Sequence, residues 1–548
     1  MLLMLLAWIY ITLLCRGWGA ILRAVLRLDG DAGISGAASP FLGLAAVGAV
    51  LGIASLLVPL GGIGIQLLLL APPIVFALLR RRTFKPAGLL NPFALSGPFL
   101  WAWAACALLF LVLGSWEITH PDTLAYHTAT IRWIEEYPVI RGLAHLNHRY
   151  GYQGLWYQLC AAFSFRFAGG AALSYLPPVF ALWCTGCLLG GAQAAAEKRG
   201  ALPALLWLAL LAYLLCDFNA LRLTAASAGN DLAAAAFAWL SLHLLLQGRG
   251  KDRHDIAVTI CALVATCIKL SAAPVLLLPL LRLFAPGRRG LRLAGGAAAT
   301  LLLLGPLLLR NVLTTGYPLY PSPMAGFPVD WKLSPEAAQY ELRYVMAWAR
   351  SPWLQTGAEV DAVLRGPASA WLPRWWDARS GAERVLLLML LPALPLAALR
   401  LRHGADRNLR LTVFVTVLAG LAYWWLQAPD PRFGLGSIIA LIALALYPFG
   451  ETPRLPARLA GGACFLLTLA LCAYTGYRLV HYFRPEQLLC PTGVLNAGYE
   501  KINCQGAWFY RHRSAQDAER PVPVPSLAVP CDSIKLRGTR IEDGFRAP

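Results

Sequence analysis

Long apolar runs constrain this chain more than any other feature. Runs of about 17 to 25 residues recur along it, each long enough for a helix to cross a hydrocarbon layer roughly 30 Å thick. Hydrophobic residues make up 58% of the 548 residues and charged residues 14%, which is too apolar for a soluble globule. Lipid cannot hydrogen-bond a free backbone, and the sequence lacks the alternating pattern of a β-barrel. We therefore predict an all-α fold, a polytopic transmembrane helical bundle.

Basic residues suggest how the chain is threaded through the membrane. The net charge is +19, but Arg and Lys lie in short clusters between the apolar runs. This distribution is typical of cytoplasmic loops and does not indicate a nucleic-acid partner. Placing all the clusters on one side gives about fourteen helices with both termini on the other side. The expected crossings are 2–22, 40–60, 63–79, 97–114, 173–193, 201–217, 231–247, 256–268, 271–284, 293–312, 383–399, 411–427, 433–449 and 459–481.

The same threading divides the chain into successive parts. Residues 1–96 form N-terminal transmembrane helices, and residues 97–325 form a core whose first outer loop is 115–170. Within that loop, the apolar segment 155–167 is expected to be an interfacial helix. Residues 314–382 form a long outer loop able to cover a site, 383–482 are C-terminal transmembrane helices, and 483–548 are a small outer tail.

Residues 115–165 carry acids, histidines and aromatics together, directly after an apolar run. Glu117, His120, Asp122 and His127 lie close in sequence there, just beyond the expected end of a membrane helix. A carboxylate at a membrane face can be tuned by burial and still reach a water-borne substrate. The alternative is an ordinary solvated loop, because many charged loops carry no function.

Two acids have a second possible role as helix caps. Asp122 lies in HPDTLAYH, where a helix could begin, and Asp231 opens the apolar segment DLAAAAFAW. Asp is a preferred N-cap residue, so either carboxylate could simply cap a helix. Asp122 is otherwise a candidate general base, with Glu117 as a second candidate, and Asp231 an acid facing the same site.

Three cations lie where an outer site could use them. Lys269 interrupts an apolar stretch, and its alternative role is to extend its ammonium to the interface. Arg310 and Arg432 lie at outer helix ends, and the planar guanidinium group suits phosphate. For Arg432, a simple ion pair with Asp430 is the alternative.

Histidines and aromatics add weaker signals. The spacing of His120, His127, His145 and His148 matches no metal motif, so we expect no cofactor, although a metal ion is not excluded. Tyr152 and Trp156 could stack on sugar rings, or they could belong to an interfacial aromatic belt.

The polar tail holds three of the thirteen cysteines, Cys490, Cys504 and Cys531. Two of them should pair in an oxidising compartment, and we favour Cys504 with Cys531, although the sequence does not determine the pairing. A tail this small is expected to pack against the outer loops rather than fold alone.

Several segments together resemble integral-membrane glycosyltransferases of the GT-C superfamily. They are the first-loop acids, YGYQGLWYQLCAAFSF, GNDLAAAAFAWLSL, CIKLSAAPVLLLPLL and RNVLTTGYPLYP, and they cover roughly residues 97–325. The similarity is closest to the branch containing protein O-mannosyltransferases and the aminoarabinose transferases of lipid A. The segments APDPRFG and RIEDGFRAP and the Cys-containing tail are similar to an uncharacterised group of bacterial polytopic membrane proteins.

The resemblance to the GT-C superfamily implies a function. The donor would be a sugar on a polyprenyl phosphate, and the acceptor a cell-envelope glycan, lipid or protein. It implies that Asp122, or Glu117 in its place, activates the acceptor, with phosphate contacts from Lys269 and Arg310. It also implies a multi-pass protein of the bacterial inner membrane, in contact with membrane lipid, whose active face is periplasmic.

Other functions compete with this one. An envelope polysaccharide polymerase or ligase would also use outward-facing acids and arginines. A transporter or flippase of lipid-linked sugars should show inverted repeats and ionisable residues in the middle of several helices. Apart from Lys269, the sequence has few such residues, so we favour the glycosyltransferase.

Overall fold

A computed structural model describes most of the chain. The described residues are 1–28, 36–80, 93–168, 175–198, 225–248, 251–352, 354, 356–401, 407–446, 457–479, 485–489, 491–492, 496, 498–513 and 521–548. Most of them are helical, as the apolar pattern predicts. The expected crossing at 201–217 and Cys490 lie outside the described residues.

The described helices occur along the chain in the following order. Up to the middle of the chain they are α1 (Leu2–Val25), α2 (Ser39–Leu57), α3 (Ile63–Leu79), α4 (Gly97–Gly114), the π-helical turn η3 (Thr123–His127), α5 (Thr128–Glu136), α6 (Leu155–Ala162), α7 (Leu176–Lys198), α10 (Asp231–Gly248) and α11 (Asp252–Ile268). The 3₁₀ helix η7 (Leu270–Leu276) follows, and then α12 (Leu277–Arg282), α13 (Arg289–Thr315), α14 (Pro335–Trp348), α15 (Gly357–Arg365), α16 (Ala368–Asp377), α17 (Gly381–Leu388), α18 (Leu390–Arg400), α19 (Arg407–Gln427), α20 (Pro431–Leu446) and α21 (Ala457–Leu479).

Within the described residues, six helical segments are long and apolar enough to cross a membrane. They are Leu2–Val25, Ser39–Leu57, Gly97–Gly114, Arg289–Thr315, Gly381–Arg400 and Arg407–Gln427. Shorter apolar helices are Ile63–Leu79, Asp231–Leu246, Leu270–Arg282, Pro431–Ala445 and Gly461–Tyr474. Several of these helices expose large apolar side chains, among them Leu79, Leu301 and Leu391. Lipid is the environment in which such exposed leucines cost nothing, so length, composition and surface agree with a helical membrane protein.

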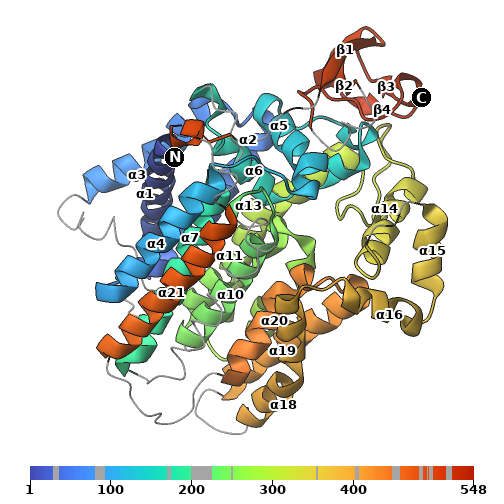
Figure 1. Ribbon diagram of the computed structural model, residues 1–548. Coiled ribbons are helices and arrows are strands. Elements are labelled where there is room, and N and C mark those ends of the chain that lie inside the picture. Colours follow the sequence, from blue (N-terminus) through green and yellow to red (C-terminus); the bar gives the residue numbers. More distant parts are fainter. Residues whose placement is uncertain are drawn as a thin grey trace.

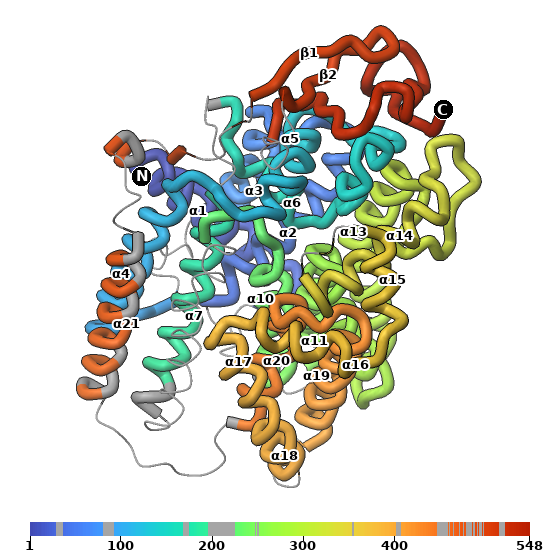
Figure 2. Tube along the Cα trace, turned by 45° about the vertical axis from the view of Figure 1, so that its right-hand side comes forward, coloured from blue at the N-terminus to red at the C-terminus, as the bar shows by residue number. Residues whose placement is uncertain are grey.

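Neighbouring helices join distant parts of the sequence (Figures 1 and 2). α4 packs against both α7 and α21, so residues 97–114 lie beside the last helix of the chain. α20 packs against α10, α18 and α19, and α13 packs against α2 and α11. Figure 1 shows the short strands at one end of the helices and α14 to α16 along one side.

The segment 155–167, for which the sequence predicts an interfacial helix, begins with α6. This helix packs against α2 and α5 and all eight of its residues are buried, so it presents no apolar face to lipid. A helix of this length spans only about 12 Å, so it does not cross a membrane either. Its apolar residues are explained by burial inside the protein.

The helix break expected at Lys269 is present. α11 ends at Ile268, Lys269 adopts an extended backbone conformation, and η7 begins at Leu270. The pieces on either side are shorter than most membrane-spanning helices, with 17 residues in α11, and the break leaves the Lys269 side chain at their junction.

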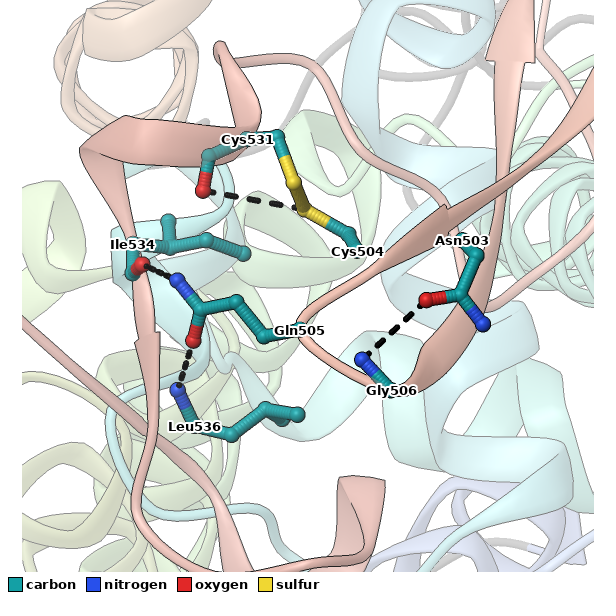
Figure 3. The surroundings of a disulfide bond; sticks show 7 residues. All are labelled: Asn503, Cys504, Gln505, Gly506, Cys531, Ile534 and Leu536. Carbon is teal, nitrogen blue, oxygen red and sulfur yellow. Dashed lines mark hydrogen bonds between the residues drawn. A yellow bond between two sulfur atoms is a disulfide. The ribbon is translucent and has the colours of Figure 1, made fainter.

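The C-terminal tail is a small disulfide-linked unit (Figure 3). Strand β1 (Tyr499–Cys504) pairs antiparallel with β2 (Ala507–His512), and β3 (Lys535–Leu536) pairs antiparallel with β4 (Phe545–Arg546). Cys504 and Cys531 form the predicted disulfide, with their Cα atoms 5.8 Å apart. The Gln505 amide beside it accepts a hydrogen bond from the Leu536 backbone N–H and donates one to the Ile534 carbonyl.

The tail packs on the loops that follow α4, as its small size predicts. Phe509 and Phe545 share a buried cluster with Trp133 of α5 and Tyr150. The Arg537 guanidinium donates to Asp330 at 2.9 Å, so the tail also contacts the outer segment 314–382. The tail therefore ties the first loop to that segment.

Close packing of α1 on α2 gives a stability prediction. A Cβ atom at Gly43 would collide with the backbone carbonyl oxygen of Cys15. Gly43→Ala should therefore lower the free energy of unfolding by about 1–3 kcal/mol, because the helices must separate. Thermal unfolding of the detergent-solubilised protein measures this loss. Gly64→Ala, at a position with open space around it, is the control and should not destabilise the protein.

Candidate functional site

A cavity of about 530 Å³ lies between the first loop, the α10 and α11 ends, α14 and the start of α20. Its volume falls within the range typical of small-molecule sites, about 300–1,000 Å³. Seven of the ten site residues predicted from the sequence line it. They are His120, Asp122, His127, Tyr152, Asp231, Lys269 and Arg432.

Asp122 is paired across the fold with Arg432. The Arg432 Nη1 donates to the Asp122 Oδ2 at 2.9 Å. Asp122 precedes η3, but its side chain makes no capping hydrogen bond, so the N-cap alternative is wrong. A single π-helical turn such as η3 is a conformation often found at functional sites.

Burial and charge act in opposite directions on Asp122. Burial alone would raise the pKa of its carboxyl group, but Arg432, His127 and His120 outweigh it and hold the pKa of Asp122 well below the usual range. The Asp122 Oδ1 accepts no hydrogen bond from any described residue. The carboxylate is therefore ionised and has one oxygen available to a ligand.

Arg432 is held from several sides. Its backbone N–H donates to the Asp430 Oδ1 at 3.1 Å, and its guanidinium lies 4.9 Å from the ring centroids of both Trp348 and Phe433. Asp430 is in turn bound by Arg379 at 3.0 Å. The expected pair with Asp430 thus exists alongside the contact with Asp122. The Arg432 Nη2 donates to no residue in the described parts of the chain, which leaves it for a ligand.

A second acid and cation pair lies beside the first. The Lys269 ammonium donates to Asp231, the first residue of α10, and lies 3.8 Å from the Phe433 ring centroid. Phe433 thus touches both cations. We call Asp122, Asp231, Lys269 and Arg432 the charged cluster.

The two histidines are linked through Thr123. The Thr123 hydroxyl contacts the Nδ1 atoms of His127 at 3.0 Å and His120 at 3.4 Å, and the two imidazole rings stack at 6.5 Å. Burial lowers the pKa of His127 to about 3, so this side chain is neutral at pH 7. Within the described residues, no three His, Cys, Asp or Glu side chains are grouped to hold a metal ion.

Three predicted site residues do not line the cavity. Arg310 is buried in α13, where it donates to Gln153 at 2.7 Å and to the Ser55 carbonyl at 2.8 Å. Trp156 is buried in α6 with its ring 5.2 Å from that of Phe180. Glu117 lies just after α4, outside the lining. Arg310 therefore acts on the cavity through Gln153, which does line it.

Sequence reasoning missed a second cluster in the same cavity. Arg149 and Glu341 form an ion pair at 3.7 Å, and the Tyr152 hydroxyl donates to Glu341 at 2.9 Å. Tyr126, Tyr320 and Tyr344 line the cavity around them. We call these six residues the tyrosine cluster. Tyr126 and Arg149 lie in the acid-rich stretch already singled out, but Glu341 and Tyr344 belong to an amphipathic helix with no distinguishing motif.

A narrow slot of about 50 Å³ adjoins the charged cluster. It shares Asp231, Lys269, Arg432 and Phe433 with the cavity and continues between α10, η7, α19 and α20. Mostly small or apolar side chains line the rest of it, among them Ala234, Ala235, Ala238, Gly436 and Val417, together with the hydroxyl groups of Ser271, Thr416 and Ser437. The slot thus leads from the cations into the apolar part of the helix bundle.

The comparisons with known proteins give a family without an activity. Residues 1–439 match the profile of a family described as a domain of unknown function, DUF8201. No curated protein and no solved structure matches the chain. The match includes every residue of the charged and tyrosine clusters and excludes the C-terminal tail.

The ion pair of Asp122 predicts a pH-dependent contribution to stability. Asp122→Asn should lower the free energy of unfolding by about 1–2 kcal/mol at pH 7, because it removes the half-buried charged partner of Arg432. The pKa of Asp122 is depressed in the folded state, so this contribution is complete above the unfolded value of about 4 and is lost as the pH falls further.

Thermal unfolding of the wild type and the variant between pH 3 and pH 8 tests this prediction. The difference between them should be constant above about pH 5 and shrink below about pH 4. Asp361→Asn removes the half-exposed pair with Arg343 and is the control, with a loss of less than about 1 kcal/mol. An equal loss from both substitutions would contradict a special contribution of the Asp122–Arg432 pair.

Proposed function

The chain belongs to the DUF8201 family, whose name assigns no activity, and from its own residues we propose a membrane glycosyltransferase. It transfers a sugar from a polyprenyl-phosphate-linked donor to a cell-envelope acceptor. The observation that carries the proposal is the charged cluster itself, with two acids and two cations from separate elements in one cavity beside an apolar slot.

The cations suit the phosphate of the donor. Lys269 and Arg432 lie against the same Phe433 ring, and the Arg432 Nη2 makes no hydrogen bond within the described chain. Guanidinium and ammonium groups are the preferred protein partners of phosphate. Asp122 and Asp231 pair with these cations, so an entering phosphate would displace the two carboxylates from Arg432 and Lys269.

Asp122 is the proposed general base, and phosphate binding activates it. When the donor phosphate takes over Arg432, the Asp122 carboxylate loses the partner that depresses its pKa and becomes a stronger base. It accepts the proton of the acceptor hydroxyl as that oxygen bonds to the anomeric carbon. The bond from this carbon to the phosphate oxygen breaks, and its electron pair leaves on the polyprenyl phosphate, where Lys269 and Arg432 stabilise the charge.

The slot suits the lipid part of the donor. It begins at Asp231, Lys269 and Arg432 and is walled by small side chains on α10 and α20. An isoprenoid chain is apolar, and a slot of about 50 Å³ has room only for the part of it next to the phosphate, so its walls would separate as the rest of the chain enters. The phosphate would then remain at the charged cluster while the chain extends toward membrane lipid.

We also propose the threading and location that suit this reaction. About fourteen helices in a GT-C-like arrangement would cross the bacterial inner membrane, with the cavity on the periplasmic face. The disulfide of the tail favours this orientation, because disulfides persist in oxidising compartments. The Tyr150 hydroxyl, next to Arg149 of the cavity, contacts Ser526 of the tail at 3.1 Å, so tail and cavity lie at the same end.

Transfer of radiolabelled sugar from polyprenyl-phosphate donors to envelope material tests the proposal. Asp122→Asn should reduce the rate by about 10²–10⁴-fold, as expected for loss of a general base. Lys269→Ala should also reduce it, because the departing phosphate loses a cation. Glu117→Gln should retain activity, because Glu117 lies outside the cavity lining.

Expression and thermal unfolding of each variant must match the wild type for this comparison. Wild-type membranes that transfer no sugar from any donor would rule out glycosyl transfer and favour a transporter. Loss of activity in Glu117→Gln but not in Asp122→Asn would instead show that the base is wrongly assigned.

A further inference from the structure

The tyrosine cluster has the chemistry of a second binding site in the cavity. Tyr126, Tyr152, Tyr320 and Tyr344 come from η3, the loop before α6, the loop after α13 and α14. The rings of Tyr126 and Tyr152 lie 5.9 Å apart and those of Tyr152 and Tyr320 lie 5.7 Å apart. Aromatic walls with a few converging polar groups are the usual composition of a small-molecule site.

Arg149 and Glu341 supply the polar groups. The Arg149 guanidinium lies 5.6 Å from the Tyr126 ring centroid and 5.5 Å from that of Tyr344. Its Nη1 and Nη2 atoms donate to no residue in the described ranges, and its Nε approaches Glu341 no closer than 3.7 Å. Glu341 receives a hydrogen bond from Tyr152 on Oε1, while its Oε2 accepts none from the described residues. Unused donors and an unused acceptor therefore lie side by side.

We propose that the tyrosine cluster is the acceptor subsite and that it binds a neutral sugar residue. This inference rests on the proposed function, because it assigns the acceptor of the same cavity as a glycan rather than a lipid or a protein.

The pairing of charges favours a neutral sugar over a charged ligand. Arg149 and Glu341 cancel each other, so the subsite does not concentrate positive charge for a phosphate or a polyanion. A hydroxyl group both donates and accepts a hydrogen bond, and the guanidinium and carboxylate offer both partners. The apolar C–H face of a pyranose ring matches the flat tyrosine rings.

The arrangement of the cavity separates this subsite from the lipid passage. The slot shares Asp231, Lys269 and Arg432 with the charged cluster and no residue with the tyrosine cluster. Tyr126 connects the two clusters, since its ring lies 4.4 Å from that of His127 and 5.9 Å from that of Tyr152. A sugar on the tyrosine cluster would thus lie beside the residues around Asp122, where its hydroxyl could lose a proton.

Direct binding tests the subsite without relying on transfer. The purified full-length protein in lipid nanodiscs is titrated with lactose, maltose, mannobiose and chitobiose by calorimetry. In parallel it is titrated with a Ser/Thr-containing peptide and with polyprenyl phosphate. We expect at least one neutral disaccharide to bind and the peptide not to bind.

Two variants of α14, each with a matched control, locate the binding. Glu341→Gln and Tyr344→Leu should weaken disaccharide binding by about tenfold or more, because each removes a partner inside the cavity. Glu336→Gln and Tyr340→Leu change the same residue types on the same helix but outside the lining, and should leave affinity unchanged. Lys269→Gln should weaken polyprenyl phosphate binding and leave disaccharide binding intact.

The outcomes separate this inference from the proposed function. If no disaccharide binds the wild type, if only the peptide binds, or if the α14 variants bind as well as their controls, the acceptor subsite is wrong. Disaccharide binding without polyprenyl phosphate binding would leave the subsite standing and overturn the donor assignment. Polyprenyl phosphate binding without disaccharide binding would overturn the acceptor subsite and leave the donor assignment standing.

Discussion

The contact between Asp122 and Arg432 is the interaction on which the site depends. It joins the loop after α4 to the first turn of α20, 310 residues later, and both residues line the cavity. Arg432 also connects this contact to Asp430 and, through it, to Arg379 before α17. The pair is half-buried, so removing one partner leaves a charge that water only partly compensates, which costs more than losing a fully exposed pair.

Charge balance links the structure of the cavity to its chemistry. Three acids and three cations line it, paired as Asp122 with Arg432, Asp231 with Lys269 and Glu341 with Arg149. The charges that line the cavity therefore neutralise one another in pairs. An entering phosphate competes with two carboxylates, so donor binding and the basicity of Asp122 are coupled. Such coupling would delay activation of the acceptor until the donor is in place.

The sequence predicted the helices and the charged cluster well, because a long apolar run and a charge within or beside it are both rare by chance. The sequence did not predict the role of residues whose type and surroundings are common in many helices. Glu341 and Tyr344 lie on a polar helix. They can be recognised as site residues only through their contacts with Arg149, about 190 residues earlier in the sequence. Arg310 looked like a phosphate ligand, but its guanidinium is bound to Gln153 and to a backbone carbonyl inside the protein. Its neighbour Asn311 lines the cavity instead, because successive residues of a helix point in different directions.

The central claim is that the charged cluster holds the phosphate of a lipid-linked sugar. Its most direct test is a cryo-electron microscopy structure of the protein in nanodiscs with a polyprenyl phosphate sugar analogue bound. The account predicts the phosphate within hydrogen-bond distance of Lys269 and Arg432, the Asp122 carboxylate released from Arg432, and the lipid chain in the adjoining slot. Density for the phosphate elsewhere on the protein, with the pair between Asp122 and Arg432 intact, would contradict it.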